Sequence, residues 1–141
     1  MEVPGLIAID HVGIAVPDLD VAIAFYQDVF GFKLTHREVN QEQGVQEAML
    51  SLGESETTIQ LLAPMGPDST IAKFLAKAGP GVQQLAFRVA NIQTASAALR
   101  SAGLRLLYEN AKIGTGGSLI NFVHPKDAGG VLVELVQPPI A

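Results

Sequence analysis

Four polar residues interrupt otherwise apolar segments of this sequence, and each has a side chain that can bind a metal ion: His11, Gln60, Gln84 and Glu134. In Ile59-Gln60-Leu61 the polar side chain points to one face alone, because successive side chains of a strand alternate. One imidazole, two amide oxygens and one carboxylate suit octahedral Co²⁺, Mn²⁺, Ni²⁺ or Mg²⁺ better than structural zinc. Four ligands on a six-coordinate ion leave two positions for substrate oxygens.

The four residues fall at equivalent places in two similar halves of the chain. Two pairs of segments are alike: Asp10–Leu19 with Gln83–Ile92, and Ile59–Pro64 with Val133–Pro138. His11 and Gln84 are 73 positions apart, and Gln60 and Glu134 are 74 positions apart. Two nearly equal offsets indicate an internal duplication. If the halves pack about a pseudo-twofold axis, we expect the four side chains to converge on one point.

The order of secondary-structure signals is the same in both halves. The first strand ends in Asp18 or Asn91, and both residue types cap helices well. The helix that follows has one apolar face and stops at a glycine, Gly31 or Gly103. An apolar segment that predicts the next strand follows each glycine: Phe32–Leu34 and Leu104–Tyr108. Each half then closes on a strand followed by proline.

These signals predict an α+β fold of two tandem βαβββ modules that form one curved mixed sheet around a metal-binding cleft. The internal repeats span about 7–64 and 80–138, and a connecting helix is predicted over 69–78. At 141 residues, with 48% apolar and 16% charged, the chain suits one domain over 1–141 and is too short for two ordinary ones.

Composition excludes several classes of function. The net charge is −5 and the nine Lys and Arg are scattered singly, so nucleic acid is not an expected partner. The chain has no cysteine, which excludes disulfides, thiolate zinc sites and cysteine nucleophiles. It shows no basic leader and no membrane-length apolar run, so we expect a soluble cytoplasmic protein without a membrane partner.

Taken singly, the candidate residues also have structural interpretations. A lone histidine near a strand start is more often structural than a metal ligand, and single Gln or Glu residues in strands are ordinarily exposed. The glycine run at 114–117 suits either the approach of backbone N–H groups to an anionic or planar ligand, or a hairpin loop. The joint repetition of the four polar residues favours the metal site.

Six segments together carry a family resemblance: Asp10–Val12, Asn40–Met49, Ile71–Leu75, Gly114–Gly117, Asn121–Lys126 and Gly130–Leu135. On these segments, and over nearly the whole chain, the sequence resembles the methylmalonyl-CoA epimerases of the vicinal oxygen chelate superfamily, which includes glyoxalases, bleomycin resistance proteins and dioxygenases. The resemblance implies epimerisation of (2R)- and (2S)-methylmalonyl-CoA, a step of propionate metabolism. It also implies a CoA thioester substrate and a homodimer.

The resemblance implies four metal ligands: His11, Gln60, Gln84 and Glu134. Co²⁺ is the expected ion, with Mn²⁺, Ni²⁺ or Mg²⁺ as alternatives. Members of the family often have a His-His pair where this chain has Gln83-Gln84, so an amide replaces an imidazole. An amide oxygen binds Co²⁺ or Ni²⁺ more weakly, and metal affinity is therefore the property most affected.

The resemblance also assigns the catalytic base to Glu47, which on sequence alone would read as an exposed strand residue. Inversion at one carbon by a two-base route needs an acid/base group on each side, and Glu134 is the candidate for the second. A divalent ion would neutralise charge on the enolate. Five cationic or titratable residues are candidates to meet the CoA phosphates, with nothing to select among them: His36, Arg37, Lys112, His124 and Lys126.

Three other functions fit the same fold. A glyoxalase I would use a similar ligand set and a related enediolate. An extradiol dioxygenase fits less well, because a non-haem iron triad wants two histidines and only His11 occupies a ligand position. A metal-free ligand-binding protein would lack a stoichiometric divalent ion.

Overall fold

The structure is a computed structural model that describes residues 2–140. The described residues divide into two compact units, His11–Gln83 and residues 2–10 with 84–140. Strands β1 (Leu6–Ala15) and β5 (Gly81–Val89) each cross the boundary between them.

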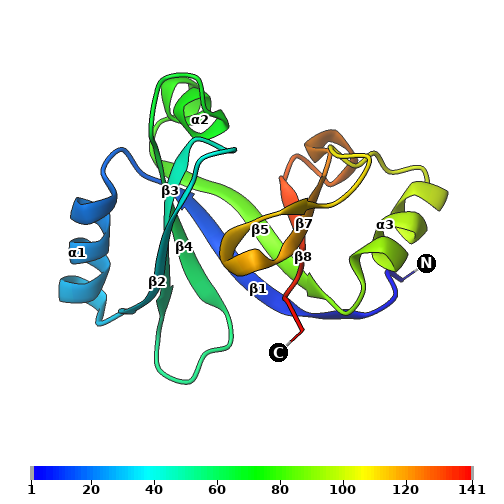
Figure 1. Ribbon diagram of the computed structural model, residues 1–141, viewed down its shortest axis with the longest axis horizontal. Coiled ribbons are helices and arrows are strands. Elements are labelled where there is room, and N and C mark those ends of the chain that lie inside the picture. The colour runs from blue at the N-terminus through cyan, green and yellow to red at the C-terminus, as the bar shows by residue number, and fades with distance from the viewer. Residues whose placement is uncertain (1, 141) are drawn as a thin grey trace. The chain divides into compact units, whose positions relative to one another are not determined.

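The unit His11–Gln83 contains the end of β1 and five further elements: α1 (Leu19–Phe30), β2 (Lys33–Asn40), β3 (Val45–Ser51), β4 (Thr58–Pro64) and α2 (Thr70–Ala78). Its strands lie in the order β2-β3-β4-β1. The pairs β2/β3 and β3/β4 are antiparallel, and β4/β1 is parallel. Helix α1 lies along one side of β2, β3 and β4 (Figure 1).

Local signals start and stop α1 where the sequence predicts. The Asp18 carboxylate accepts a hydrogen bond from the Val21 N–H at 3.1 Å, which caps the helix N-terminus. Gly31 ends the helix with a left-handed φ of 75°, a conformation that costs glycine little. Leu19 and Ile23 then pack on a buried strand face made by Ala48, Leu50, Leu61 and Ala63.

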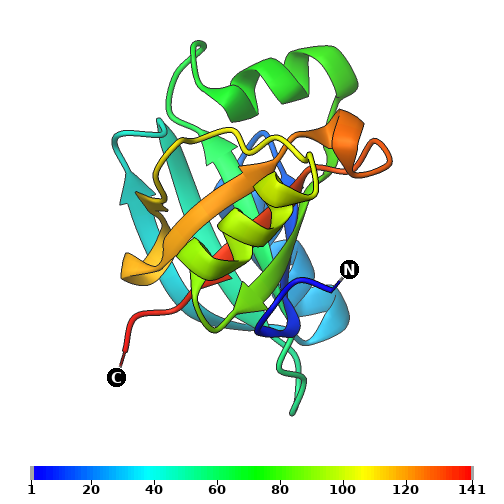
Figure 2. The same ribbon diagram turned by 90° about the vertical axis from the view of Figure 1, so that its right-hand side faces the viewer.

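The second unit contains α3 (Ile92–Ser101), β6 (Lys112–Ile113), β7 (Leu119–Val123), β8 (Val133–Gln137) and two 3₁₀ turns, Thr115–Gly117 and Pro125–Asp127. Its strand order is β5-β8-β7-β6, with β5/β8 parallel and the other pairs antiparallel. Asn91 caps α3 by accepting from the Thr94 N–H at 2.9 Å. Helix α3 covers the face that carries Val123 and Leu135 (Figure 2).

Most predicted elements are confirmed. Each half follows the predicted order of strand, helix and strands, and α2 with its Ser69 cap matches the connecting helix predicted over 69–78. The closing strands before Pro64 and Pro138 are β4 and β8. Among the described residues no helix is both long enough and apolar enough to span a membrane.

The strand predicted over Leu104–Tyr108 is wrong. That stretch makes one isolated bridge, between Leu106 and Val123, and the strand of this half is the two-residue β6 further along. The side chain of Asn121 explains the difference, because it accepts from the Tyr108 N–H at 3.1 Å and donates to the Tyr108 carbonyl at 2.9 Å. A side chain thus satisfies the backbone groups that a neighbouring strand would have paired.

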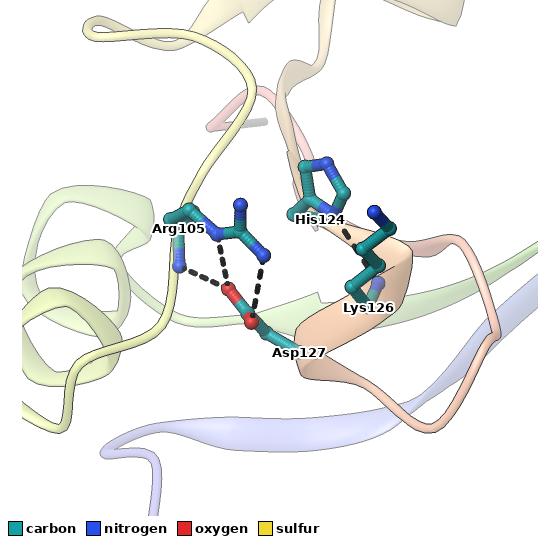
Figure 3. A network of polar contacts seen from close by, with 4 residues as sticks. All are labelled: Arg105, His124, Lys126 and Asp127. Carbon is teal, nitrogen blue, oxygen red and sulfur yellow. Dashed lines mark hydrogen bonds and ion pairs between the residues drawn. The ribbon is translucent and has the colours of Figure 1, made fainter.

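An ion pair fixes the turn that follows β7. The Arg105 guanidinium donates to both oxygens of Asp127, at 3.0 and 3.1 Å, and the Arg105 backbone N–H adds a third bond at 2.9 Å (Figure 3). These hydrogen bonds from Arg105 lower the pKa of Asp127 to about 2. The segment between β7 and β8 is therefore tied to the chain before β6.

This lowered pKa predicts a pH-dependent contribution to stability. Because the folded pKa lies below the unfolded value, the ion pair stabilises the protein fully above about pH 4 and progressively less as the pH falls towards 2. We expect Asp127→Asn to have a lower urea unfolding midpoint than wild type at neutral pH. The difference between the two midpoints should become smaller below about pH 4. Asp68→Asn, at an exposed carboxylate of the other unit, is the control. If the difference in urea midpoint stayed constant across this pH range, the Arg105–Asp127 ion pair would not be the source of the pH dependence.

Candidate active site

In the unit His11–Gln83, three predicted site residues share one face of the strands. Gln60 pairs with Gly13 of β1 and with Met49 of β3. Paired residues point to the same side and every second residue along a strand does too, so His11, Gln60 and Glu47 lie on one face. Their exposed fractions are only 4%, 3% and 5%.

This face is distinct from the one that α1 covers. Ala48 and Leu61 alternate with the three polar residues, and they point towards α1. On the polar face itself, Ala15, Val45 and Leu62 form a small buried cluster with Ile71 of α2. The sequence therefore builds one apolar face for the helix and one face on which a carboxylate, an imidazole and an amide are held beside apolar side chains.

The second unit brings the other two predicted ligands into contact. Gln84 and Glu134 are 50 residues apart, and the Gln84 amide nitrogen donates to the Glu134 carboxylate at 3.0 Å. The register explains the contact: Glu134 pairs with Ala86 of β5, two residues from Gln84, so both side chains point to the same face. Gln84 is 6% and Glu134 5% exposed.

Apolar side chains surround this pair. On β7, Phe122 lies directly opposite Glu134. Phe122 also packs against a buried cluster of Ala86, Ile120 and Val136. Burial of a carboxylate among apolar side chains costs free energy unless polar donors or a cation compensate for the lost hydration, and the Gln84 amide is one such donor.

Burial decides between interpretations that the sequence left open. The interpretation of Gln60, Gln84 and Glu134 as exposed edge-strand residues is wrong, and so is that of Glu47, because all four are nearly inaccessible. Within residues 2–140, no three His, Cys, Asp or Glu side chains form a cluster able to hold a metal. The predicted ligand set holds one histidine and one glutamate, so half of its donors would be amide oxygens.

Two residues of the second unit, Asn121 and Tyr108, have contacts that the residue pattern did not predict. Asn121 pairs with Leu135 and therefore lies on the strand face that α3 covers, opposite to the face of Glu134. Asn121 is 1% exposed and brackets the Tyr108 backbone, and the Tyr108 ring meets the Phe122 ring edge-on with centroids 6.0 Å apart. Phe122 is the residue opposite Glu134, so Tyr108 reaches the neighbourhood of the predicted ligand. The signal was present in Leu119-Ile120-Asn121-Phe122-Val123, where one polar residue interrupts an apolar strand.

The glycine run joins β6 to β7 as a hairpin loop. The Gly114 N–H donates to the Ser118 carbonyl at 2.8 Å, and Gly116 has a φ of 65°. A Cβ on Gly114 would lie 2.8 Å from the Ile120 side chain, so Ile120 would have to shift to accommodate any other residue there. The hairpin interpretation is confirmed, and ligand binding by this run stays a prediction.

Comparison with known proteins defines the class. The family model of the Glyoxalase/Bleomycin resistance protein/Dioxygenase superfamily matches residues 10–122, and the chain belongs to this superfamily. It is 44% identical over 131 residues to the mitochondrial methylmalonyl-CoA epimerase of Homo sapiens, with 92% of this chain and 73% of that protein covered. The predicted resemblance to methylmalonyl-CoA epimerases is confirmed.

Solved structures lead to the same group of enzymes. The crystal structure of methylmalonyl-CoA epimerase from Mycobacterium tuberculosis is 54% identical, with 99% of this chain and 93% of that chain covered and a TM-score of 0.95. A Streptomyces coelicolor methylmalonyl-CoA epimerase variant in complex with 2-nitronate-propionyl-CoA is 45% identical, with coverages of 96% and 99% and a TM-score of 0.92. The predicted vicinal oxygen chelate fold is confirmed.

Proposed function

We propose that this chain is a methylmalonyl-CoA epimerase, which interconverts (2R)- and (2S)-methylmalonyl-CoA by proton abstraction at C2. The observation that carries the proposal is the buried carboxylate of Glu47, on the same strand face as His11 and Gln60. Its similarity to named epimerases supports the substrate class. A nitronate is a planar anion like the enolate of this reaction, and a relative binds a nitronate of propionyl-CoA.

The metal ligands we propose are His11, Gln60, Gln84 and Glu134. The donor set fits a hard divalent ion, and the Gln84–Glu134 hydrogen bond adds a structural reason. That bond uses the amide nitrogen of Gln84, so the carbonyl oxygen is the atom of this amide that would coordinate a cation. We propose Co²⁺, with Mn²⁺, Ni²⁺ or Mg²⁺ as alternatives. A bound ion would act as a Lewis acid on the thioester and carboxylate oxygens of the substrate.

Glu47 is the proposed base. Its carboxylate would take the C2 proton of one epimer and keep it, while a second acid/base group would deliver a proton of its own to the opposite face of the planar enolate. Glu134 is the proposed acid/base group for that opposite face, where its hydrogen bond from Gln84 holds one carboxylate oxygen in place. Each of the two carboxylates is only 5% exposed, and a base shielded in this way favours return of the proton from a protein group over return from bulk water.

Proton NMR of methylmalonyl-CoA in D₂O with added Co²⁺ or Mn²⁺ tests the function. We expect enzyme-dependent deuterium exchange at C2 together with interconversion of the epimers, because each turnover passes through an enolate. Absence of exchange at C2 would exclude the epimerase. Activity towards a glutathione hemithioacetal instead would favour a glyoxalase I-like lyase. Purification without any stoichiometric divalent ion, in the absence of chelators, would favour a metal-free ligand-binding protein.

The homodimer, the cytoplasmic location and the role in propionate metabolism stay predictions. Light scattering during size-exclusion chromatography measures the first of these directly.

A further inference from the structure

The contacts in the structure distinguish among the five residues that are candidates to bind the phosphates of CoA. Three of these side chains already contact another group. The His36 Nε2 lies 2.6 Å from a carboxylate oxygen of Glu38, and a guanidinium nitrogen of Arg37 lies 2.6 Å from a carboxylate oxygen of Asp20. The Lys112 ammonium lies 4.4 Å from the centroid of the Tyr108 ring. His124 and Lys126 remain. Both belong to the turn after β7, in the unit that contains Gln84 and Glu134.

The other arginines of this unit are engaged as well. Arg88 pairs with Asp10 at 2.7 Å, and Arg105 pairs with Asp127. Arg100 donates to the backbone carbonyls of Tyr108 and Glu109. Among the described residues of this unit, the exposed Lys126 ammonium is the cationic side chain without an anionic, aromatic or carbonyl partner. It is therefore the cation that can neutralise an external anion at no cost to an existing contact.

Contacts within the turn after β7 neutralise its negative charge and orient a hydrogen-bond donor, and both effects favour binding of an anion. The only acidic residue between β7 and β8 is Asp127, and Arg105 neutralises its charge with three hydrogen bonds. The His124 Nδ1 accepts from the Lys126 N–H at 3.2 Å, which places the hydrogen of a neutral imidazole on Nε2. His124 and Lys126 extend from the same turn (Figure 3). The turn thus offers a fixed N–H donor and an ammonium group.

The position of the turn suits the far end of a CoA thioester. Phe122 lies opposite Glu134, and β7 runs from Phe122 directly into His124. The strand rise of about 3.3 Å per residue puts His124 roughly 7 Å beyond Phe122, and Lys126 lies further along the chain. The pantetheine arm separates the thioester from the phosphates of CoA by several such steps.

We propose that Lys126, with His124 beside it, binds a phosphate group of the CoA thioester substrate. This inference rests on the proposed function for its substrate class. The contact lies away from the reacting carbon and acts equally on substrate and transition state, so it contributes to KM and not to kcat.

Lys126→Ala should reveal the contact through substrates that lack phosphates. We expect it to raise KM for methylmalonyl-CoA about 5- to 10-fold with kcat unchanged, as loss of one charge-assisted contact does. The increase should vanish for the methylmalonyl thioester of 3′-dephospho-CoA if the 3′-phosphate is bound. If the diphosphate is bound, it should vanish only for the pantetheine thioester. Equal increases for all three thioesters, or no increase, would overturn the proposal.

Two controls separate charge from other effects. Lys77→Ala makes the same change in net charge at an exposed lysine of α2 and should leave KM unchanged. Lys126→Arg should restore most of the affinity, since it keeps the positive charge.

Calorimetric titration with CoA itself keeps this inference distinct from the epimerase proposal. Wild type should bind CoA with a lower Kd than Lys126→Ala. The ratio of the two Kd values should fall as ionic strength rises. Equal binding, or no binding of CoA by wild type, would overturn the phosphate contact. If wild type binds CoA more tightly than Lys126→Ala but shows no deuterium exchange at C2, only the proposed epimerase activity is rejected.

Discussion

Glu47→Gln is expected to lower kcat for methylmalonyl-CoA epimerisation by roughly 100- to 10,000-fold, the range that general-base catalysis contributes. Glutamine keeps the size and hydrogen-bonding capacity of the side chain but cannot accept the C2 proton. The buried strand face with His11 and Gln60 should therefore persist while the chemistry stops. Stopped assays of epimer interconversion and C2 deuterium exchange measure the effect.

The same variant must retain its metal if Glu47 is a base and not a ligand. Elemental analysis should give equal metal content for Glu47→Gln and wild type. Glu54→Gln, an exposed carboxylate in the turn between β3 and β4, is the matched control and should keep full activity. Loss of metal from Glu47→Gln would show that its role has been misassigned, and full activity would remove it from the mechanism.

Glu134→Ala is expected to reduce affinity for Co²⁺ by more than roughly 100-fold, since even the partners of metal ligands are worth 10- to 100-fold. It removes the one carboxylate of the proposed ligand set, together with the hydrogen bond that this carboxylate accepts from the Gln84 amide N–H. Loss of a buried hydrogen bond to a charged group costs about 1.5–3 kcal/mol, so the variant should also be less stable to urea. Metal titration followed by elemental analysis measures the first effect.

Two variants show whether the loss is specific. Glu109→Gln removes an exposed carboxylate of the same unit and should retain stoichiometric metal. Gln84→His replaces an amide ligand by an imidazole, which binds Co²⁺ and Ni²⁺ more strongly, and should hold these ions more tightly than wild type. Wild-type metal content in folded Glu134→Ala would contradict its assignment as a ligand.

Features that depend on neighbours in sequence were predictable. The helices begin at Asp18, Ser69 and Asn91, where short polar side chains bond to N–H groups three residues on. The closing strands before Pro64 and Pro138 follow from their apolar residues and the proline after them. The repeat needed no structure either, because it consists of matching residue types at matching offsets.

The segment Leu104–Tyr108 shows where local patterns fail. Its apolar residues predict a strand, but the side chain of Asn121 takes both backbone groups of Tyr108. Arg105 is held by Asp127, 22 residues later. Contacts of this range depend on how β7 and its turn pack, and no window of sequence contains them.

For the candidate site, the sequence by itself determined which side chains can act: four possible ligands at repeated positions and, through the family resemblance, a base at Glu47. The tertiary structure decided that these side chains are buried and which of them meet. Strand register puts Gln84 against Glu134 across 50 residues, and His11, Gln60 and Glu47 on one face. Residue type sets the chemistry available to a side chain, but its neighbours are set by pairing between distant strands, where a shift of one residue would turn it to the opposite face.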